Sequence, residues 1–285
     1  MLYSSIGYYA LIFGLAISFP IFFFSIKSFK NDKILDNKII NFSFIQLLLV
    51  IVSFLGLVLS FVNSDFSNET VFNNSHTTKP LFYKISGTWG NHEGSLLLWL
   101  LVLTLFIFVF LVRTKSLPKK YRILTVLFQQ IIIIGFFVFL IISSNPFNYI
   151  FPIPDEGLGL NPILQDPALA IHPPILYFGY VGSSIIFSSV LAATTLHYIS
   201  KTWATHIKSW VLVSWIFLTL GILLGSIWAY YELGWGGFWF WDPVENVSLM
   251  PWLALTTLLH CVLILEKRSV LTSWVIILSI ATFTL

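Results

Sequence analysis

Apolar residues occur along this chain in long runs that are separated by shorter polar segments. Each run has about 16 to 23 residues, the number that a helix needs to cross a hydrocarbon layer of roughly 30 Å. The pattern predicts an all-α, polytopic membrane protein whose residues 1–285 form a single membrane domain. The eight predicted spans are Ile6–Ile26, Phe42–Val62, Ser95–Val112, Ile123–Ile142, Pro174–Leu196, Ile207–Trp228, Leu249–Leu265 and Val270–Leu285.

The composition agrees with this pattern, since 57% of the 285 residues are hydrophobic and 9% are charged. Soluble domains carry about 25% charged residues, so membrane lipid is the expected surrounding of this chain. The net charge of +3 is small and gives no indication of nucleic-acid binding. The one cysteine, Cys261, lies inside an apolar run, which excludes a disulfide framework or a cysteine metal cluster within this chain.

The basic residues predict an orientation. Of the 15 lysines and arginines, all except Lys79 and Lys84 fall in connections on one side of the predicted spans. Because cytoplasmic loops carry the excess of basic residues, the N-terminus and three long loops should face outward, to a periplasm or an intermembrane space. These outward loops are Asn63–Gly94, Ser143–Pro173 and Ala229–Ser248.

The third outward loop is crowded with aromatic residues. An interfacial belt of tryptophan and tyrosine is one interpretation. A belt does not need glycines between the rings, whereas glycines let a backbone lie close to a flat ligand. We therefore favour an aromatic platform for a planar, apolar macrocycle, and the belt stays open as the alternative. The residues concerned are Trp228, Trp235, Gly236, Gly237, Trp239 and Trp241.

Asp242 follows the aromatic residues directly and is followed by Pro243 and, at the third helical position, Glu245. This order matches a capping box that starts the next helix. Helix capping is thus the favoured interpretation over catalysis, and both carboxylates could also help to shape the platform.

His172 is the first candidate histidine, at the end of the second outward loop and just before Pro173 and Pro174. A residue before proline is restricted to extended conformations, so a stiff corner should present this imidazole at the membrane surface. The preceding Asp166-Pro167 predicts a short helix that leads into the corner. Most surface histidines have no special function, and that alternative remains open here.

His260 is the second candidate and lies within the seventh predicted span, nine residues beyond Pro251. This spacing places it about 13 Å below the predicted outer start of the helix. Ionisable groups at such a depth are rare and are usually functional or paired. Axial haem ligation and a hydrogen bond to a neighbouring carbonyl or hydroxyl are both compatible with the sequence.

Three segments resemble a known family. The sequence WGGFWFWDPVENVSLMPW, within Trp228–Trp252, resembles the tryptophan-rich "WWD" signature of haem-handling proteins in cytochrome c biogenesis. The segments WGNHEGSLLLW and LNPILQDPALAIHPPILYFGYVG are similar to those of cytochrome c maturation protein F. The three motifs are well separated and stand in the order of that family.

The resemblance implies roles for individual residues. His172 matches the first external histidine of the family, an axial ligand to the haem in transit. His260 matches the first intramembrane histidine, a ligand to a resident b-type haem. The tryptophan-rich loop, including Asp242, would hold the incoming haem.

The resemblance also implies partners and an activity. A haem chaperone would deliver haem, and a thiol-bearing protein would present apocytochrome c, whose CxxCH cysteines form thioether bonds with the haem vinyl groups. The chain stops before the second external and the second intramembrane histidine, so a second polypeptide is expected to carry the C-terminal part of a split protein. Haem lyase (holocytochrome c synthase) activity is expected only from the multi-chain complex. Abundant Phe, Ile, Asn and Lys favour a mitochondrial inner membrane, with a bacterial plasma membrane as the alternative.

A competing interpretation is a membrane subunit or scaffold of a respiratory complex or a transporter. A transporter would be expected to carry ionisable residues on several spans. His260 is the one such residue that the sequence places at depth. Haem content separates a scaffold that has lost its chemistry from a haem lyase component.

Overall fold

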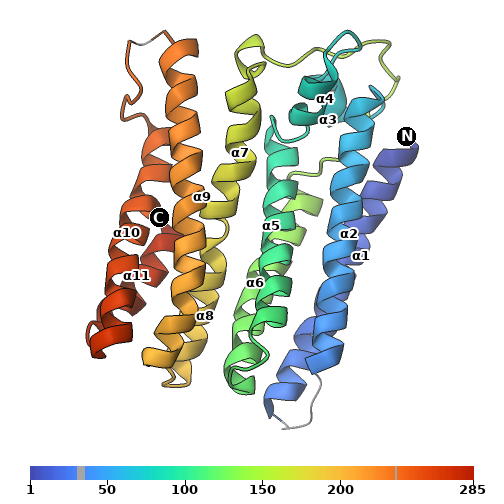
Figure 1. Cartoon of the computed structure of the whole chain (residues 1–285). Helices are drawn as coiled ribbons and strands as arrows, with labels where there is room; N and C mark the ends of the chain where they lie inside the picture. Colours follow the sequence, from blue (N-terminus) through green and yellow to red (C-terminus); the bar gives the residue numbers. More distant parts are fainter. Residues whose placement is uncertain (31–35, 235) are drawn as a thin grey trace. The chain divides into compact units, whose positions relative to one another are not determined.

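The computed structural model describes residues 1–30, 36–234 and 236–285 (Figure 1). These residues form no strand, and an isolated bridge joins Asn68 and Tyr149. The all-α prediction is confirmed. The helices are α1 (Leu2–Lys30), α2 (Asp36–Val62), α3 (Glu69–Asn74), α4 (Leu81–Gly87), α5 (His92–Arg113), α6 (Lys119–Ile142), the 3-10 turn η1 (Pro162–Leu164), α7 (Pro167–Tyr180), α8 (Ser183–Thr195), α9 (Lys201–Glu232), α10 (Pro243–Arg268) and α11 (Thr272–Thr284).

Seven stretches of the described residues are long and apolar enough to cross a membrane, which confirms a polytopic membrane protein. Six of them are single helices: α1, α2, α5, α6, α9 and α10. The seventh, Pro167–Thr195, combines α7 and α8. α11 corresponds to the predicted eighth span, but its 13 residues extend for only about 20 Å.

The fifth predicted span starts earlier than expected. α7 begins at Pro167 rather than at Pro174, and a turn after Tyr180 separates it from α8. Asp166 explains the early start, because its Oδ1 accepts hydrogen bonds from the backbone N–H groups of Ala168 (2.8 Å) and Leu169 (3.0 Å). The predicted short helix before His172 is therefore continuous with the span.

The chain divides into two compact units. The division falls inside α1, α5, α6 and α7, so these helices contribute to both units. The first unit comprises Met1–Phe24, Leu35–Phe108 and Gln130–Ile171, and the second comprises Ser25–Ile34, Val109–Gln129 and His172–Leu285.

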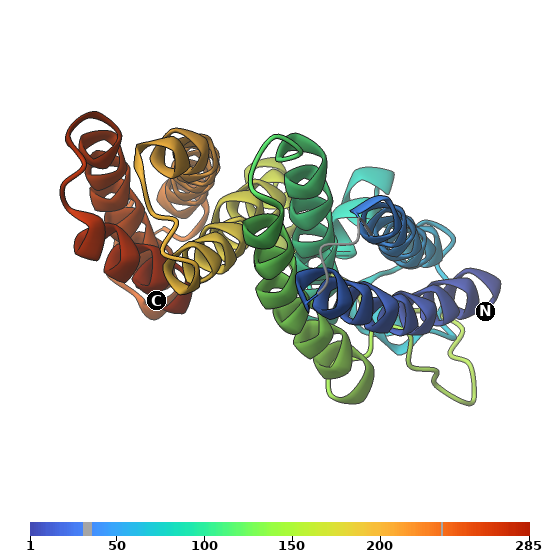
Figure 2. The ribbon, with the colours of Figure 1, turned by 90° about the horizontal axis from the view of Figure 1, so that it is seen from below.

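In the first unit, α1 and α2 run side by side and approach closely through glycines (Figure 2). A Cβ atom added to Gly56 would lie 2.9 Å from Cα of Gly7. A Cβ atom added to Gly7 would lie 2.4 Å from the ring of Phe147. Small residues allow such close contacts between membrane helices, where hydrophobic burial does not drive association.

In the second unit, α8, α9, α10 and α11 pack in contact with one another. Polar side chains join α6 to α8 inside this apolar surrounding. The amide of Gln129 donates to Oγ of Ser184 (2.9 Å) and accepts from Oγ of Ser188 (2.8 Å). Such interhelical hydrogen bonds fix the pairing of helices in a membrane.

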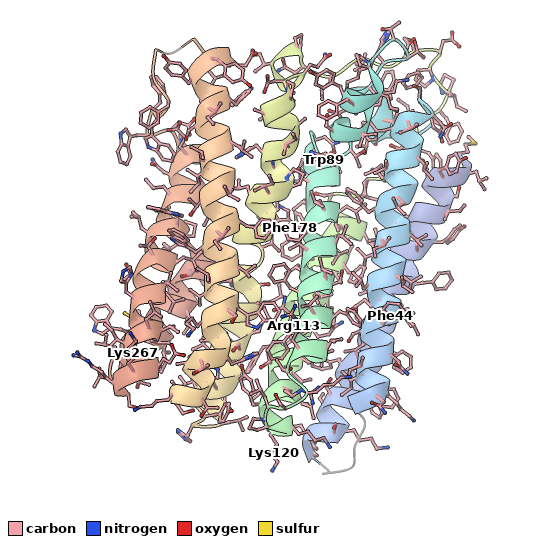
Figure 3. All side chains as sticks on the ribbon, viewed as in Figure 1. Phe44, Trp89, Arg113, Lys120, Phe178 and Lys267 are labelled. Atoms are coloured by element: carbon pink, nitrogen blue, oxygen red, sulfur yellow. The ribbon has the colours of Figure 1, made fainter. Side chains whose placement is uncertain are left out.

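Basic residues of the second unit lie away from the aromatic loop, and the direction in which this loop faces stays a prediction. Figure 3 shows Lys120 and Lys267 toward the end of this unit that lies opposite the α9–α10 connection. The aromatic loop and these lysines thus lie at opposite ends of the same unit, as an outward loop and inward basic connections would.

Candidate functional site

The aromatic loop is shorter than the predicted segment Ala229–Ser248. Because α9 extends to Glu232 and α10 begins at Pro243, the loop comprises only residues 233–242. Trp228 lies within α9, as the predicted span Ile207–Trp228 expects. Gly234 (φ +66°) and Gly236 (φ +79°) adopt the left-handed backbone conformation that favours glycine. An added Cβ at either position would meet no atom within 4 Å, so conformation and not crowding requires these glycines. Trp235 lies outside the described residues.

Three polar side chains fix the C-terminal end of this loop. Oδ1 of Asp242 accepts a hydrogen bond from the backbone N–H of Glu245 (2.7 Å), which confirms the predicted N-cap. The Glu245 carboxylate in turn accepts from the backbone N–H of Phe240 (2.7 Å), and the Asn246 amide donates to the carbonyl of Trp241 (2.9 Å). Trp241 is thereby held at φ +60°, a conformation that is strained for a bulky residue.

Several rings of the loop point away from the protein. The exposed fractions are 69% for Trp241 and 65% for Phe238, and Tyr230 in the last turn of α9 is 62% exposed. The rings of Trp239 and Trp241 meet edge to face, with centroids 6.1 Å apart and planes inclined by 84°. The indole Nε1 atoms of Trp228 and Trp239 are buried and have no hydrogen-bond partner among the described residues. The loop and the adjoining end of α9 thus combine exposed aromatic area with two unpaired donors, which an added acceptor would satisfy.

α7 and α9 pack closely through glycines at three successive positions. A Cβ atom added to Gly179 would lie 2.3 Å from the backbone N of Leu218. One added to Gly221 would lie 2.6 Å from Cα of Leu176. His172 lies one turn before Leu176 on the same face of α7. Gly225 lies one turn after Gly221 on the same face of α9. The packing of α7 on α9 therefore places the imidazole of His172 against the α9 backbone.

His172 is helical, and the predicted extended corner is wrong. The Asp166 cap starts α7 five residues earlier, and the helix continues through Pro173 and Pro174. Nδ1 of the half-buried imidazole lies 2.7 Å from the carbonyl oxygen of Gly221. A carbonyl can only accept, so Nδ1 carries the proton, and in the neutral imidazole Nε2 keeps its lone pair.

A tryptophan from the first outward loop replaces a hydrogen bond that a proline removes. Pro174 has no N–H group to donate to the carbonyl of Ala170 in the preceding turn of α7. In the first unit, the indole Nε1 of Trp89 donates to this carbonyl (2.8 Å). The contact satisfies the backbone group and explains how α7 tolerates an interior proline.

His260 lies on α10, whose start differs from the prediction. The helix begins at Pro243 and contains Pro251, so His260 is about 26 Å along the helix from its first residue, and not about 13 Å as predicted. The side chain is exposed, and its Nδ1 lies 2.8 Å from the carbonyl of Thr256. The neighbouring-carbonyl interpretation is confirmed for Nδ1, and Nε2 has no hydrogen-bond partner among the described residues. Cys261 beside it is buried, as a packing residue would be.

A reciprocal pair of hydrogen bonds joins α9 to α10 next to this histidine. The indole of Trp215 on α9 donates to Oγ1 of Thr256 on α10 (2.8 Å). The indole of Trp252 on α10 donates to Oγ1 of Thr219 on α9 (2.8 Å). Thr256 therefore takes part in this pair through its hydroxyl and contacts His260 through its carbonyl.

The first unit contains a pocket of about 210 Å³. Its lining is polar throughout and includes two carboxylates, so it does not suit a planar, apolar ligand. The lining residues are Glu69, Thr70, Asn73, Asn74, Glu93, Ser143, Ser144, Asn145 and Asn148.

Both lysines of the predicted outward loops have partners in the first unit. Nζ of Lys79 donates to the carbonyl of Asn74 (3.0 Å), and Nζ of Lys84 donates to Oγ of Ser64 (2.8 Å). Burial, with a smaller contribution from the charge of Lys84, lowers the pKa of Lys79 to about 8. These ammonium groups therefore serve the packing of the loop itself.

The described candidates His172, Trp228, Trp239, Trp241, Asp242 and His260, together with Gly236 and Gly237, all belong to the second unit. The sequence interpretation missed the residues that hold them, namely Trp215, Thr219, Gly221, Gly225, Asn246 and Thr256. One signal was available, because Gly221 and Gly225 form a GxxxG pattern, which is typical of close contacts between membrane helices.

Comparison with known proteins gives consistent results. The sequence profile of the family described as "Cytochrome C assembly protein" matches residues 89–285. The protein named "Cytochrome c-type biogenesis protein CycK" from Bradyrhizobium diazoefficiens is 56% identical over 240 residues, covering 84% of this chain and 36% of the relative. "Cytochrome c-type biogenesis protein CcmF" from Escherichia coli is 44% identical over 245 residues, covering 86% of this chain and 38% of the relative.

A solved structure supports the same assignment. It is that of "Cytochrome c Heme Lyase CcmF", which matches with a TM-score of 0.88 and 28% identity over 99% of this chain and 46% of the other. The chain thus spans less than half the length of these relatives. With the profile match over most of its length, the chain belongs to the cytochrome c assembly protein family.

Proposed function

We propose that this chain is the haem-holding part of a cytochrome c haem lyase. In this proposal, His172 binds the iron of the haem in transit, and the aromatic loop covers the face of the macrocycle. His260 binds the iron of a resident b-type haem. The observation that carries the proposal is that each histidine has Nδ1 bonded to a helix carbonyl, because this leaves Nε2 as the nitrogen available to iron.

The residues present fit a haem group. Exposed rings of Phe238 and Trp241 offer the apolar, aromatic area that a planar macrocycle needs. Haem also carries propionates, which need donors. The lysines of the outward loops are engaged elsewhere, whereas the buried indole N–H groups of Trp228 and Trp239 have no partner among the described residues. We therefore propose the indoles as propionate donors.

The exposure of His260 supports a further polypeptide segment against α10. A polar imidazole on a membrane-spanning segment is costly when it faces lipid. Coverage by a second haem ligand removes that cost. Since the related proteins are longer than this chain, the covering segment is either a second polypeptide or a remaining part of the same protein.

The chain supports thioether formation by holding and orienting its substrate. Cys261 is buried in α10, and in this proposal the sulfur atoms come from the cysteines of apocytochrome c. Each thiol would add across a vinyl group of the held haem, with a carbon–sulfur bond formed and the thiol proton transferred to the adjacent vinyl carbon. The chain contributes iron ligation, an apolar surface that excludes water, and a fixed orientation of the macrocycle.

The proposal implies several partners and a location in a membrane. A haem chaperone would supply haem to the aromatic loop, and a thiol-bearing protein would present apocytochrome c. The relatives named above come from bacteria, which favours a bacterial plasma membrane. Abundant Phe, Ile, Asn and Lys favour a split mitochondrial form in the inner membrane, and fractionation of the source cell decides between the two.

A pyridine-haemochrome spectrum of the purified protein in detergent tests the proposal. We expect His260→Ala to lose b-type haem and His172→Ala to lose captured haem and mature cytochrome c. The exposed His92 provides a matched control, and His92→Ala should retain both. A wild-type protein without haem, whose variants still mature cytochrome c, would instead favour a scaffold or a respiratory or transport subunit.

A further inference from the structure

The imidazole of His172 lies against a part of α9 that carries no side chain. A Cβ atom on Gly225 would lie 2.8 Å from Cε1 and 3.2 Å from Nδ1 of this ring. One turn earlier in α9, the carbonyl of Gly221 accepts the hydrogen bond from Nδ1. The ring can occupy this place only while residue 225 has no Cβ, because a methyl group there would overlap it.

Gly225 differs in this respect from the other glycines between α7 and α9. An added Cβ on Gly179 or Gly221 would first meet backbone or Cα atoms of the facing helix. An added Cβ on Gly225 would meet, as its three nearest atoms, three atoms of the His172 ring. Gly179 and Gly221 therefore set the distance between the helices, and Gly225 leaves room for the imidazole.

We propose that Gly225 and the carbonyl of Gly221 are positioning groups that hold His172 as the Nδ1–H tautomer and present Nε2 as its iron-binding nitrogen. This inference rests on the proposed function, in which His172 binds haem iron. A neutral imidazole binds a metal through one nitrogen, and the hydrogen bond of the other nitrogen determines which one. The Gly221 carbonyl also raises the basicity of the ligand nitrogen by accepting a hydrogen bond from Nδ1–H.

Gly221 and Gly225 also limit the orientation of the His172 ring. A histidine on an open helix surface can rotate about its side-chain bonds and can exchange its tautomers. Contact with the backbone at residue 225 and the bond to Gly221 restrict both motions before haem arrives. Haem capture then requires little further ordering of the His172 side chain, which favours a high affinity for haem.

Nitrogen-15 NMR of the haem-free, full chain with labelled histidine tests the tautomer directly. His172→Ala identifies the signals of residue 172 by their loss. We expect a protonated Nδ1 and an unprotonated Nε2 in the wild-type protein. The opposite tautomer, or rapid averaging of the two, would overturn the inference.

Gly225→Ala tests the positioning role through haem affinity, measured by titration of the Soret band. Loss of such supporting contacts lowers metal affinity by about 10- to 100-fold in other sites, and we expect a loss in this range. The control is Gly135→Ala on α6, since Gly135 is exposed and an added Cβ there meets no atom within 4 Å. Equal affinity of Gly225→Ala, Gly135→Ala and the wild type would overturn the inference.

The variants also separate this inference from the proposed function. If His172→Ala binds haem as tightly as the wild type, the proposed function fails, and the NMR signals still decide the tautomer. If His172→Ala loses haem and Gly225→Ala does not, only the positioning role fails. Should Gly225→Ala not fold, the wild-type tautomer remains the deciding measurement.

Discussion

Trp215 on α9 stacks against Trp252 on α10, with ring centroids 6.4 Å apart and planes inclined by 22°. Each indole donates across the interface to a threonine that lies one turn beyond the other tryptophan, at Thr256 and Thr219. The arrangement fixes the register of the two helices at the level of Thr256, whose carbonyl contacts His260. The position of this histidine therefore depends on the packing of α9 against α10.

Substitution of Thr256 should weaken this interface. Thr256→Val keeps the shape of the side chain but leaves the Trp215 N–H without its acceptor, whereas Thr256→Ser keeps the hydroxyl. We expect Thr256→Val to lower the free energy of unfolding by about 1 kcal/mol, between the average for membrane hydrogen bonds and the cost of an unpaired donor. Denaturant unfolding in detergent measures the difference. Equal stability of the two variants would contradict the reciprocal pair.

The aromatic loop should depend on Gly236 much more than on its neighbour Gly237. Gly236 adopts φ +79°, and an alanine there would be strained by roughly 1–2 kcal/mol. An added Cβ at Gly237 makes only ordinary contact with the Phe240 ring, at 3.4 Å. Hydrogen exchange at the Phe240 N–H, which is bonded to Glu245, should accelerate in Gly236→Ala and remain unchanged in Gly237→Ala. Similar exchange in both variants would argue against the left-handed turn.

Asp242 should act as a helix cap and not through its charge. Asn accepts the same hydrogen bond from the N–H of Glu245, so Asp242→Asn should retain stability and haem capture. Asp242→Ala should lower the free energy of unfolding by about 1 kcal/mol. Unfolding curves and Soret titrations of both variants provide the comparison. Loss of haem capture in a stable Asp242→Asn protein would show that the negative charge itself is required.

Lys79 should make stability depend on pH. Its pKa is lowered to about 8 in the folded protein from 10.5, so the unfolded chain binds more protons between these values. Stability should therefore rise as the pH increases from about 8 to about 10.5, with no contribution from this group to the slope below that range. Thermal unfolding of Lys79→Met should lose this part of the rise, whereas the exposed control Lys115→Met should keep it. An unchanged pH profile in Lys79→Met would refute the assignment.

Helices and the helix cap of this protein could be predicted because they depend on local sequence. The length of the apolar runs determines the spans, and the order of Asp242, Pro243 and Glu245 determines how α10 begins. The conformation of His172 was mispredicted for a related reason. The restriction that Pro173 places on the preceding residue predicts an extended corner after the short helix that Asp166 starts. The helix capped by Asp166 instead continues through Pro173 and Pro174.

The contacts that hold the two histidines could not be predicted in the same way. The bonds from His172 to Gly221 and from Trp215 to Thr256 join residues that are 49 and 41 positions apart in the sequence. They depend on the angle and register of packed helices, which periodicity does not specify. The GxxxG pattern at Gly221 and Gly225 indicates a close helix contact but does not identify the facing histidine.

The most direct test of the account is haem binding by His172→Gly in the presence and absence of imidazole. Removal of the side chain leaves the space of the ring beside Gly225, where free imidazole can enter and supply the missing nitrogen. We predict that the variant loses the Soret band of captured haem and that added imidazole restores it. A variant that captures haem as the wild type does without imidazole would contradict the role of His172 as the ligand of the haem in transit.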